Sequence, residues 1–361
     1  RLAKEIIRHG GTANLAETVE LVGAESYLLN SVSNLQTAER FLDFVESFKK
    51  KMSWHGHSPE SNPSGGNRFR GLYNISVKSL GAAMMKDPEV RLDFAIDYSE
   101  PMKDPGFYYM NSPGNDLESV AGQVASGANL ILFTTGNGSI TNFPFVPTLK
   151  VLSTTARYQL LENDIDVNAG AFLDGTPMDD LTESFLRITL RTAGGQLSKG
   201  ERARHHQVSI WRDWQQTGPI RRKSALPDAG APGTPLKTED SKKPRRQGRT
   251  YTGLRTPRGP AIDQVGLIVP ASLCSSQVAQ MLTAELNENR PVPEEIVRRF
   301  VSFGHTEGCG ATSGHSEDLL VQTLLGYLNH PLVRFALVLE HGCEKVHNEY
   351  LRSKLREAGY D

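Results

Sequence analysis

The C-terminal part of the chain alternates short apolar runs with stretches of helical spacing, and no other sequence feature constrains the fold as strongly. The apolar runs begin at Val265, Arg298 and Val333, and each is followed by an amphipathic stretch. Strands that alternate with helices predict a βαβαβα unit, in which right-handed crossover helices cover a parallel sheet. We therefore expect α/β architecture with a parallel, doubly wound (Rossmann-like) sheet over residues 257–361.

A second unit of the same kind is predicted over residues 1–217. Leu117–Ala125 has helical spacing, and Asn129–Thr134 is an apolar run typical of a strand buried on both faces of a parallel sheet. Another strand is expected at Thr148–Thr155. The turn Thr135–Thr141 is rich in hydroxyls, amides and glycine, and open α/β sheets bind ligands where strands end. An ordinary polar connection is an equal alternative for this turn.

Residues 218–256 have a different composition, with many Pro, Gly, Ser, Lys and Arg residues and few apolar ones. This composition predicts a flexible basic linker between the two units. The basic run Lys242–Arg246 is similar to a nucleic-acid patch. It has no interleaved aromatic residues, however, and we expect it to be solvated.

Composition argues against several classes of partner. The formal net charge of -1 gives no electrostatic reason to expect nucleic acid or an acidic membrane. No apolar run reaches the length of a membrane span, and neither a Walker loop nor a GxGxxG motif for nucleotides is present. With 3 cysteines and no signal peptide, a reducing cytoplasm is the expected location.

Each cysteine directly follows a predicted strand of the last unit. Because parallel strands end at the same edge of a sheet, Cys274, Cys309 and Cys343 are expected to cluster there. The accompanying polar residues are His305, Glu307, His341, Glu344 and His347. Thiolate, imidazole and carboxylate groups bind divalent transition metals, with iron, manganese and zinc all open. The alternatives are small buried apolar cysteines or a Cys–His nucleophile.

Several longer motifs resemble the altronate/galactarate dehydratase family. These motifs are Asn62–Asn67, Lys78–Gly81, Asn111–Ser119, Phe133–Ser139, Asp166–Gly170, His305–Gly310 and Gly342–Glu344. The resemblance covers most of the chain apart from the linker, with residues 1–217 similar to the C-terminal part of the family. The order of the two parts is inverted relative to the family, and an intervening Cys-Gly-Gly-Ser-Asp segment is missing.

The resemblance implies a cytoplasmic lyase that depends on a divalent metal and eliminates water from a sugar acid to give a 2-keto-3-deoxy acid. A sister branch, the sulfolactate sulfo-lyase large subunit, eliminates sulfite, and the motifs do not separate the two branches. A non-catalytic sugar-acid-binding module or partner subunit is a further alternative, as is a thiol-dependent hydrolase. The expected partners are a small sugar acid and either a second copy of the chain or a small subunit.

The resemblance and the residue chemistry together suggest roles for individual side chains. The metal, iron(II) or else manganese, is assigned to His305, Cys309 and Cys343, with Cys274 as a further ligand. Candidate acids and bases are Glu344, His347 and Lys78, whose pKa values a desolvated cleft can shift. Candidate ligands for the polyol and the carboxylate are Asn67, Asn115, Thr135 and Asn137.

Overall fold

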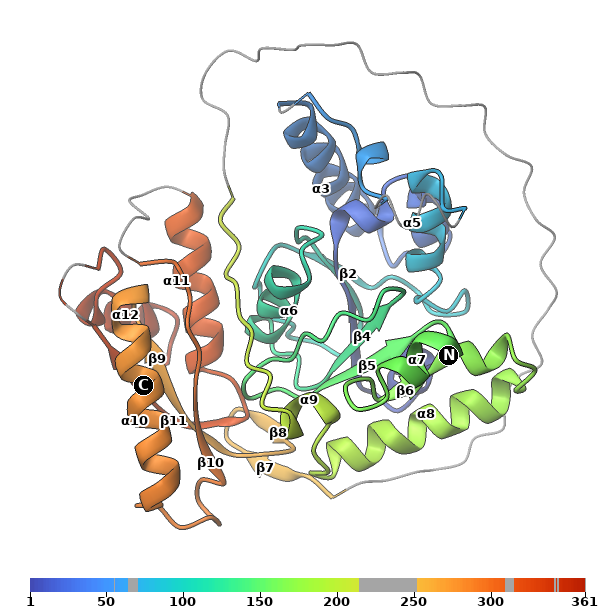
Figure 1. Cartoon of the computed structure of the whole chain (residues 1–361). Helices are drawn as coiled ribbons and strands as arrows, with labels where there is room; N and C mark the ends of the chain where they lie inside the picture. The colour runs from blue at the N-terminus through green and yellow to red at the C-terminus, as the bar shows by residue number, and fades with distance from the viewer. Residues whose placement is uncertain are drawn as a thin grey trace.

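The computed structural model describes residues 1–54, 56–63, 71–213, 252–308, 315–340, 342 and 344–360. Within these residues the strands form three parallel sheets of three strands each and one antiparallel pair, with helices packed against the sheets (Figure 1). The predicted α/β class with parallel, doubly wound units is therefore confirmed. None of the described helices is long and apolar enough to cross a membrane.

Two of the parallel sheets lie in the N-terminal unit, with strand orders β1-β3-β2 and β4-β5-β6. The strands are β1 Thr12–Leu15, β2 Phe94–Ile96, β3 Gly106–Met110, β4 Ile131–Thr135, β5 Thr148–Leu152 and β6 Val167–Asn168. Helix α6 (Asp116–Ala125) leads from β3 to β4 and so connects the two sheets. The ends of β3 and β4 are consequently brought near the same helix.

The remaining helices of this unit surround the sheets. They are α1 Leu2–Arg8, η1 Thr18–Leu21, α2 Glu25–Leu29, α3 Leu35–Trp54, η2 Pro59–Ser61, α5 Ile75–Ala83, α7 Thr155–Leu160, η3 Ala169–Phe172, α8 Met178–Ala193 and α9 Lys199–Arg202. Helix α3 buries Phe41 and Val45 in one core with Tyr109 of β3, and the rings of Phe41 and Tyr109 meet edge to face at 4.8 Å.

Two details of the predicted strands are wrong. The run at Asn129–Thr134 was expected to be buried on both faces, but β4 is an edge strand with partly exposed side chains. The strand that is buried along its whole length in this sheet is β5. The central strand β3 is not among the strands that the sequence pattern predicts, although it is buried throughout. Which strand is central depends on its pairing partners, which an apolar run does not specify.

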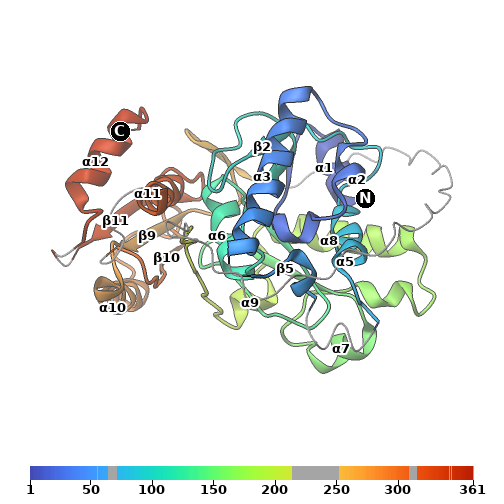
Figure 2. The same cartoon turned by 90° about the horizontal axis from the view of Figure 1, so that it is seen from above.

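The C-terminal unit has the predicted βαβαβα order. Its parallel strands β9 (Val265–Pro270), β10 (Arg299–Ser302) and β11 (Val333–Leu339) are arranged as β10-β9-β11. Helix α10 (Leu273–Asn289) lies on one face of the sheet, with α11 (His315–Leu328) on the other (Figure 2). Helix α12 (Asn348–Glu357) closes the unit.

An antiparallel pair, β7 (Leu254–Thr256) and β8 (Gly259–Ala261), precedes this sheet. Strand β7 occupies the last residues of the stretch predicted as a linker. Residues 218–251 of that stretch lie outside the described residues. The predicted unit boundaries stay predictions.

The two units share one hydrophobic core, which combines residues of α6 and β4 with residues of β9, β10 and α11. Helix α6 lies against α11 (Figure 2). At this contact Gly326 is so close to α6 that an added Cβ would collide with the carbonyl oxygen of Ala125. The hydroxyl of Tyr327 donates to the carbonyl oxygen of Ala121 at 3.0 Å, which joins the same two helices.

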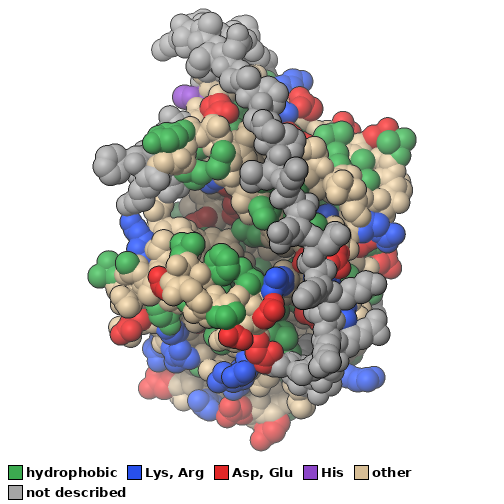
Figure 3. Space-filling view, turned by 90° about the vertical axis from the view of Figure 1, so that its right-hand side faces the viewer, with side chains coloured by type: hydrophobic (Ala, Val, Ile, Leu, Met, Phe, Trp, Pro, Cys, Tyr) green, Lys and Arg blue, Asp and Glu red, His purple; other side chains and the backbone are tan. Residues whose placement is uncertain are grey.

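One face of the molecule exposes many hydrophobic side chains. Figure 3 shows this face, on the side of Figure 1 where α5 and α7 lie, with hydrophobic side chains around a hollow. On and beside α5, Val77 and Met84 are 60% and 61% exposed, and Leu80 lies between them in sequence. Their spacing of three and four residues forms an apolar stripe on the outside of the helix.

Candidate active site

Loops that follow three parallel strands meet around the first turn of α6. The loop after β1 is joined to the loop after β3 by the backbone N–H of Glu17, which donates to Ser112 Oγ at 2.9 Å. The loop after β3 is joined to the loop after β4 by Ser139 Oγ, which donates to Asp116 Oδ2 at 3.0 Å. Ionisable and polar groups therefore gather at the carboxyl ends of the strands, where α/β sheets usually bind ligands.

Lys78, one of the predicted acids and bases, lies in a charged cluster beside these loops. Helix α5 begins after Asn74, whose side chain accepts a hydrogen bond from the backbone N–H of Val77 at 2.9 Å. The ammonium of Lys78 donates to Glu20 Oε1 at 2.7 Å and also to Asn62 Oδ1. An ammonium has three donors, and these two bonds to described residues use two of them.

Glu17 lies next to this cluster with an unusual backbone conformation. Its φ of +73° is uncommon for a residue other than glycine, and such strain costs about 1–3 kcal/mol and is frequent at functional sites. Burial raises the pKa of Glu17 from 4.5 to about 8, with the carboxylates of Glu20 and Asp116 adding to the rise and Lys78 opposing it. Glu17 can therefore exchange a proton near neutral pH. We call Glu17, Glu20, Asn62, Lys78 and Asp116 the Lys78 cluster.

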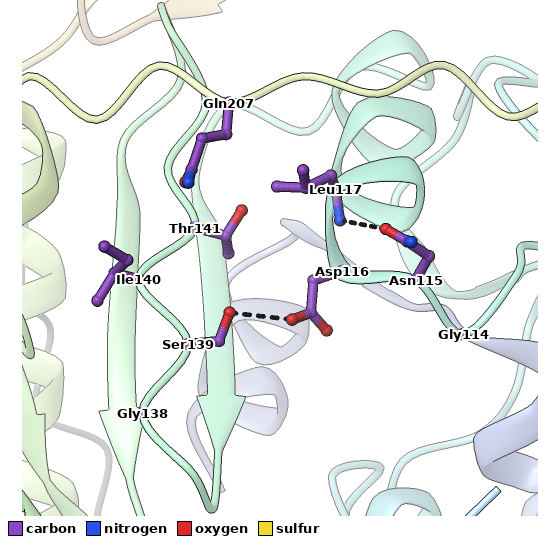
Figure 4. Close-up of a pocket in the computed structure, with 9 residues that line it drawn as sticks. All are labelled: Gly114, Asn115, Asp116, Leu117, Gly138, Ser139, Ile140, Thr141 and Gln207. Atoms are coloured by element: carbon purple, nitrogen blue, oxygen red, sulfur yellow. Dashed lines mark hydrogen bonds between the residues drawn. The ribbon is translucent and has the colours of Figure 1, made fainter.

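A cavity of about 510 Å³ opens beside the first turn of α6 (Figure 4). It is lined by Gly114, Asn115, Asp116, Leu117, Gly138, Ser139, Ile140, Thr141 and Gln207. Asn115 caps α6, since its side-chain oxygen accepts a hydrogen bond from the backbone N–H of Leu117 at 3.2 Å. The volume lies within the range of about 300–1,000 Å³ that is usual for small-molecule sites.

The predicted substrate-binding residues take different places around this cavity. Asn115 lines it. Thr135 shapes the adjoining turn, because its hydroxyl accepts hydrogen bonds from the backbone N–H groups of Gly138 at 3.1 Å and Ser139 at 3.3 Å. Asn137 is exposed, and Arg157 donates to its backbone carbonyl oxygen at 3.0 Å. Asn67 lies outside the described residues.

The two other predicted acids and bases lie in the C-terminal unit. Glu344 is buried, and its carboxylate accepts hydrogen bonds from Ser272 Oγ at 2.6 Å and from the backbone N–H of Gly342 at 2.7 Å. His347 is exposed and caps α12, with Nδ1 accepting from the backbone N–H of Tyr350 at 3.4 Å. Glu344 is therefore shielded from solvent, whereas His347 is open to it.

His305, the predicted metal ligand in the described residues, is buried with both ring nitrogens in hydrogen bonds. Nε2 lies 2.7 Å from the carbonyl oxygen of Pro270, and Nδ1 accepts from the backbone N–H of Glu307 at 3.2 Å. Burial lowers the pKa of the imidazole, which is therefore neutral at pH 7. A metal bond at either nitrogen would replace one of these hydrogen bonds.

The remaining predicted metal ligands are not described in full. Cys309 and Cys343 lie outside the described residues, as does the side chain of Cys274 in the first turn of α10. Among the residues that the structure does describe, no three His, Cys, Asp or Glu side chains gather in a way that would hold a metal ion. The described donors alone do not fit a metal, and the assignment stays a prediction.

Helix α6 also extends from the Lys78 cluster to the C-terminal unit. The pKa of Glu118 in its first turn is raised by burial and by the nearby carboxylate of Glu307. Glu307 in turn forms an ion pair with Arg212, whose Nη2 lies 2.6 Å from Oε2. Glu307 of the C-terminal unit thus approaches the same helical turn that contributes Asp116 to the Lys78 cluster.

Glu17, Glu20 and Gln207 are absent from the sequence prediction, whereas Asp116 and Thr141 lie in the predicted motif Asn111–Ser119 and the predicted turn Thr135–Thr141 without being named as site residues. Polar side chains that follow parallel strands are candidate site residues, as in the cysteine turns. By the same reasoning, Glu17 is a candidate because it follows β1. Gln207 had no such signal. It belongs to an extended segment after α9 and reaches the cavity because its backbone N–H donates to the carbonyl oxygen of Asn142 at 3.1 Å.

The fold and the site define an α/β protein with a small-molecule cavity beside a cluster of acids and bases. Residues 1–216 match the family model described as D-galactarate/Altronate dehydratase, C-terminal. Residues 262–360 match the model described as D-galactarate dehydratase/Altronate hydrolase, second domain. Since the first match covers more than half of the chain, the protein belongs to the D-galactarate/altronate dehydratase family, as the motifs predicted.

Individual relatives agree with this family. Altronate dehydratase of Escherichia coli (strain K12) is 30% identical over 212 residues, which is 59% of this chain and 42% of the relative. The (2R)-sulfolactate sulfo-lyase subunit beta of Chromohalobacter salexigens is 28% identical over 211 residues, 58% of this chain and 54% of that subunit. Galactarate dehydratase (L-threo-forming) of E. coli is 28% identical over 209 residues, 57% of this chain and 40% of the relative. The chain thus spans about half the length, or less, of these relatives.

Proposed function

We propose that the protein is a lyase that eliminates water from a sugar acid of the altronate or galactarate type and forms a 2-keto-3-deoxy acid. Family membership supports the substrate class. The observation that carries the proposal is the position of the half-buried Glu17, which lies beside the ion pair of Lys78 and Glu20 and close to the cavity at α6.

The reaction requires a base that removes a weakly acidic proton and an acid that assists the leaving hydroxyl. We assign the removal of the proton at C2 of the substrate, next to the carboxylate, to ionised Glu17. A pKa near the working pH makes a carboxylate an effective base without abolishing its ability to return the proton. The same proton can then pass to the C3 hydroxyl, so that one water leaves, and the resulting enol tautomerises to the keto acid.

Lys78 supplies positive charge for this step. Negative charge builds up on the carboxylate end of the substrate as the C2 proton is removed, and a preorganised cation stabilises it. The ammonium is held in place by Glu20 and Asn62, and we assign its third donor to the substrate. Glu344 of the C-terminal unit is a second candidate acid or base because it is buried, and His347 remains a candidate with a solvent-exposed ring.

A divalent metal, iron(II) or manganese, is proposed as the cofactor, with His305, Cys309, Cys343 and Cys274 as its ligands. Such a metal supplies Lewis-acid polarisation of a carboxylate and an adjacent hydroxyl. The test is the metal content of protein purified without oxygen, compared with Cys309→Ala and Cys343→Ala. Metal content and turnover that neither substitution changes would contradict this assignment.

The proposed activity is tested with the full chain incubated with altronate, galactarate and sulfolactate, while 2-keto acid and sulfite are measured. The expected result is that keto acid forms from altronate or galactarate, that Glu17→Gln abolishes its formation and that Lys78→Met lowers it at least about tenfold. Thr148→Val, a buried substitution on β5 that does not touch the cavity lining, serves as the folded control. A folded protein that binds none of these acids would contradict the proposal.

Sulfite release from sulfolactate is the second candidate, favoured by one observation. A relative named as a sulfo-lyase subunit matches over 211 residues at 28% identity, nearly as well as altronate dehydratase does over 212 residues at 30% identity. Sulfite released from sulfolactate, with no keto acid formed from altronate, would identify the sulfo-lyase activity. Under this alternative a small partner subunit is proposed. A second copy of the chain is the other proposed partner, and the cytoplasmic location stays a prediction.

A further inference from the structure

Thr141 places a hydroxyl in the cavity wall without a partner. The side chain is 2% exposed, and its Oγ1 has no hydrogen-bond partner among the described residues. Figure 4 shows the hydroxyl directed toward the first turn of α6, into the space that the lining residues enclose. A buried hydroxyl without a partner costs free energy, and a ligand that bonds to it removes that cost.

Gln207 enters the same cavity from a different part of the chain. Figure 4 shows its side-chain amide pointing toward Thr141. The position is fixed by the backbone, because the N–H of Gln207 donates to the carbonyl oxygen of Asn142 at 3.1 Å and the Asn142 amide donates to the carbonyl oxygen of His205 at 2.9 Å. The wall therefore offers a hydroxyl and an amide that can each donate and accept hydrogen bonds.

The charge of the lining shows which part of a sugar acid suits this cavity. Asp116 is the only charged residue among the described residues of the lining, and its carboxylate accepts a hydrogen bond from Ser139. A carboxylate attracts hydroxyl donors and repels an anionic group. In a sugar acid with a single carboxylate, such as altronate, that carboxylate is attracted instead by the Lys78 ammonium, so the neutral hydroxylated end suits the cavity.

We propose that the cavity beside α6 holds the hydroxylated tail of an open-chain sugar acid, and that Thr141 and Gln207 select substrates by the length of this tail. This inference rests on the proposed function, since it assumes that a sugar acid reacts at the Lys78 cluster. It assigns to the cavity a role in specificity that is separate from proton transfer.

The test measures binding by calorimetry with the full chain, so that its result does not depend on turnover. The ligands are altronate and a four-carbon 2,3,4-trihydroxy acid that lacks most of the tail. The variants are Thr141→Val, which removes the hydroxyl at nearly constant shape, and Gln207→Leu. Thr148→Val is a matched control because its hydroxyl is also buried without a described partner but lies outside the cavity lining.

We expect Thr141→Val and Gln207→Leu each to weaken altronate binding about tenfold, because each variant loses one or two hydrogen bonds to the ligand. Binding of the four-carbon acid should stay unchanged. Thr148→Val should bind both acids like the unchanged protein. The inference would be overturned, while the proposed function would stand, if both cavity variants bind altronate normally. The same would follow if they lose affinity equally for the two acids. No binding of altronate to the unchanged protein would overturn the inference together with the proposed function.

Discussion

The ammonium of Lys78 lies 2.7 Å from Oε1 of Glu20, and this ion pair lies next to the carboxyl of Glu17. The two partners act on Glu17 in opposite directions. The negative charge of Glu20 raises the pKa of Glu17, and the positive charge of Lys78 lowers it. Burial is the main cause of the raised pKa, and the ion pair adjusts it further, so the effect of either partner can be measured separately from the proton transfer itself.

Lys78→Met should shift the pH dependence of turnover as well as its size. Without the cation the pKa of Glu17 rises above about 8, so the limb of the pH–rate curve that requires ionised Glu17 moves to higher pH. Turnover at pH 7 should fall at least about tenfold. Lys78→Arg keeps the charge and should keep the position of the limb. An unshifted limb in a folded Lys78→Met protein would count against the acid–base role of Glu17.

Glu17→Gln should stabilise the protein at high pH while it removes activity. Below pH 4.5 the Glu17 carboxyl is protonated in the folded and the unfolded chain. As pH rises from 4.5 to about 8, the unfolded chain loses the proton while the folded chain keeps it, so the free energy of unfolding decreases. We expect the variant to be more stable by on the order of 3–5 kcal/mol at pH 9 and nearly unchanged at pH 4. Urea unfolding at both pH values measures this, and equal curves at pH 9 would refute it.

Gly326→Ala should destabilise the contact between the two units. The added Cβ would collide with the carbonyl oxygen of Ala125 in α6, and such overpacking costs about 1–3 kcal/mol. Gly81→Ala is the matched control, because a Cβ at this position in α5 meets nothing within 4 Å. It should stabilise the protein by up to about 1 kcal/mol. Equal stability of the two variants in urea would show that the contact between α6 and α11 is not tight.

His330 should make the protein sensitive to acid. Burial lowers the pKa of its imidazole to about 4, and Nε2 lies 3.2 Å from the carbonyl oxygen of Ala128 in the other unit. As pH falls from 6.5 to 4, the unfolded chain takes up a proton that the folded chain does not bind, so stability is lost over this window. The loss should be about 3 kcal/mol, and His330→Gln should flatten it. Unfolding curves at pH 7 and pH 4 compare the two proteins, and an unchanged slope would contradict the role of His330.

The sequence predicted the order of elements in the C-terminal unit well, because the alternation of apolar runs with helical spacing is a local property. Strands β9 and β11 begin at Val265 and Val333, where this pattern placed them, and a helix follows each strand. The pattern failed at β3 and β4, where the degree of burial depends on which strands pair. Longer motifs indicated the family, which the family-model matches then confirmed.

By itself, the sequence determined the alternation of strands and helices and the family, since both depend on residues that are close together in the chain. Lys78 and Asn115 could be named as site residues because they lie in recognisable motifs. Only the tertiary structure decided that Glu17, at the end of β1, lies beside Lys78 of α5 and Asp116 of α6. The pKa of a carboxyl group depends on its desolvation and on charges brought near it by folding, and neither can be read from the residues beside it in the chain.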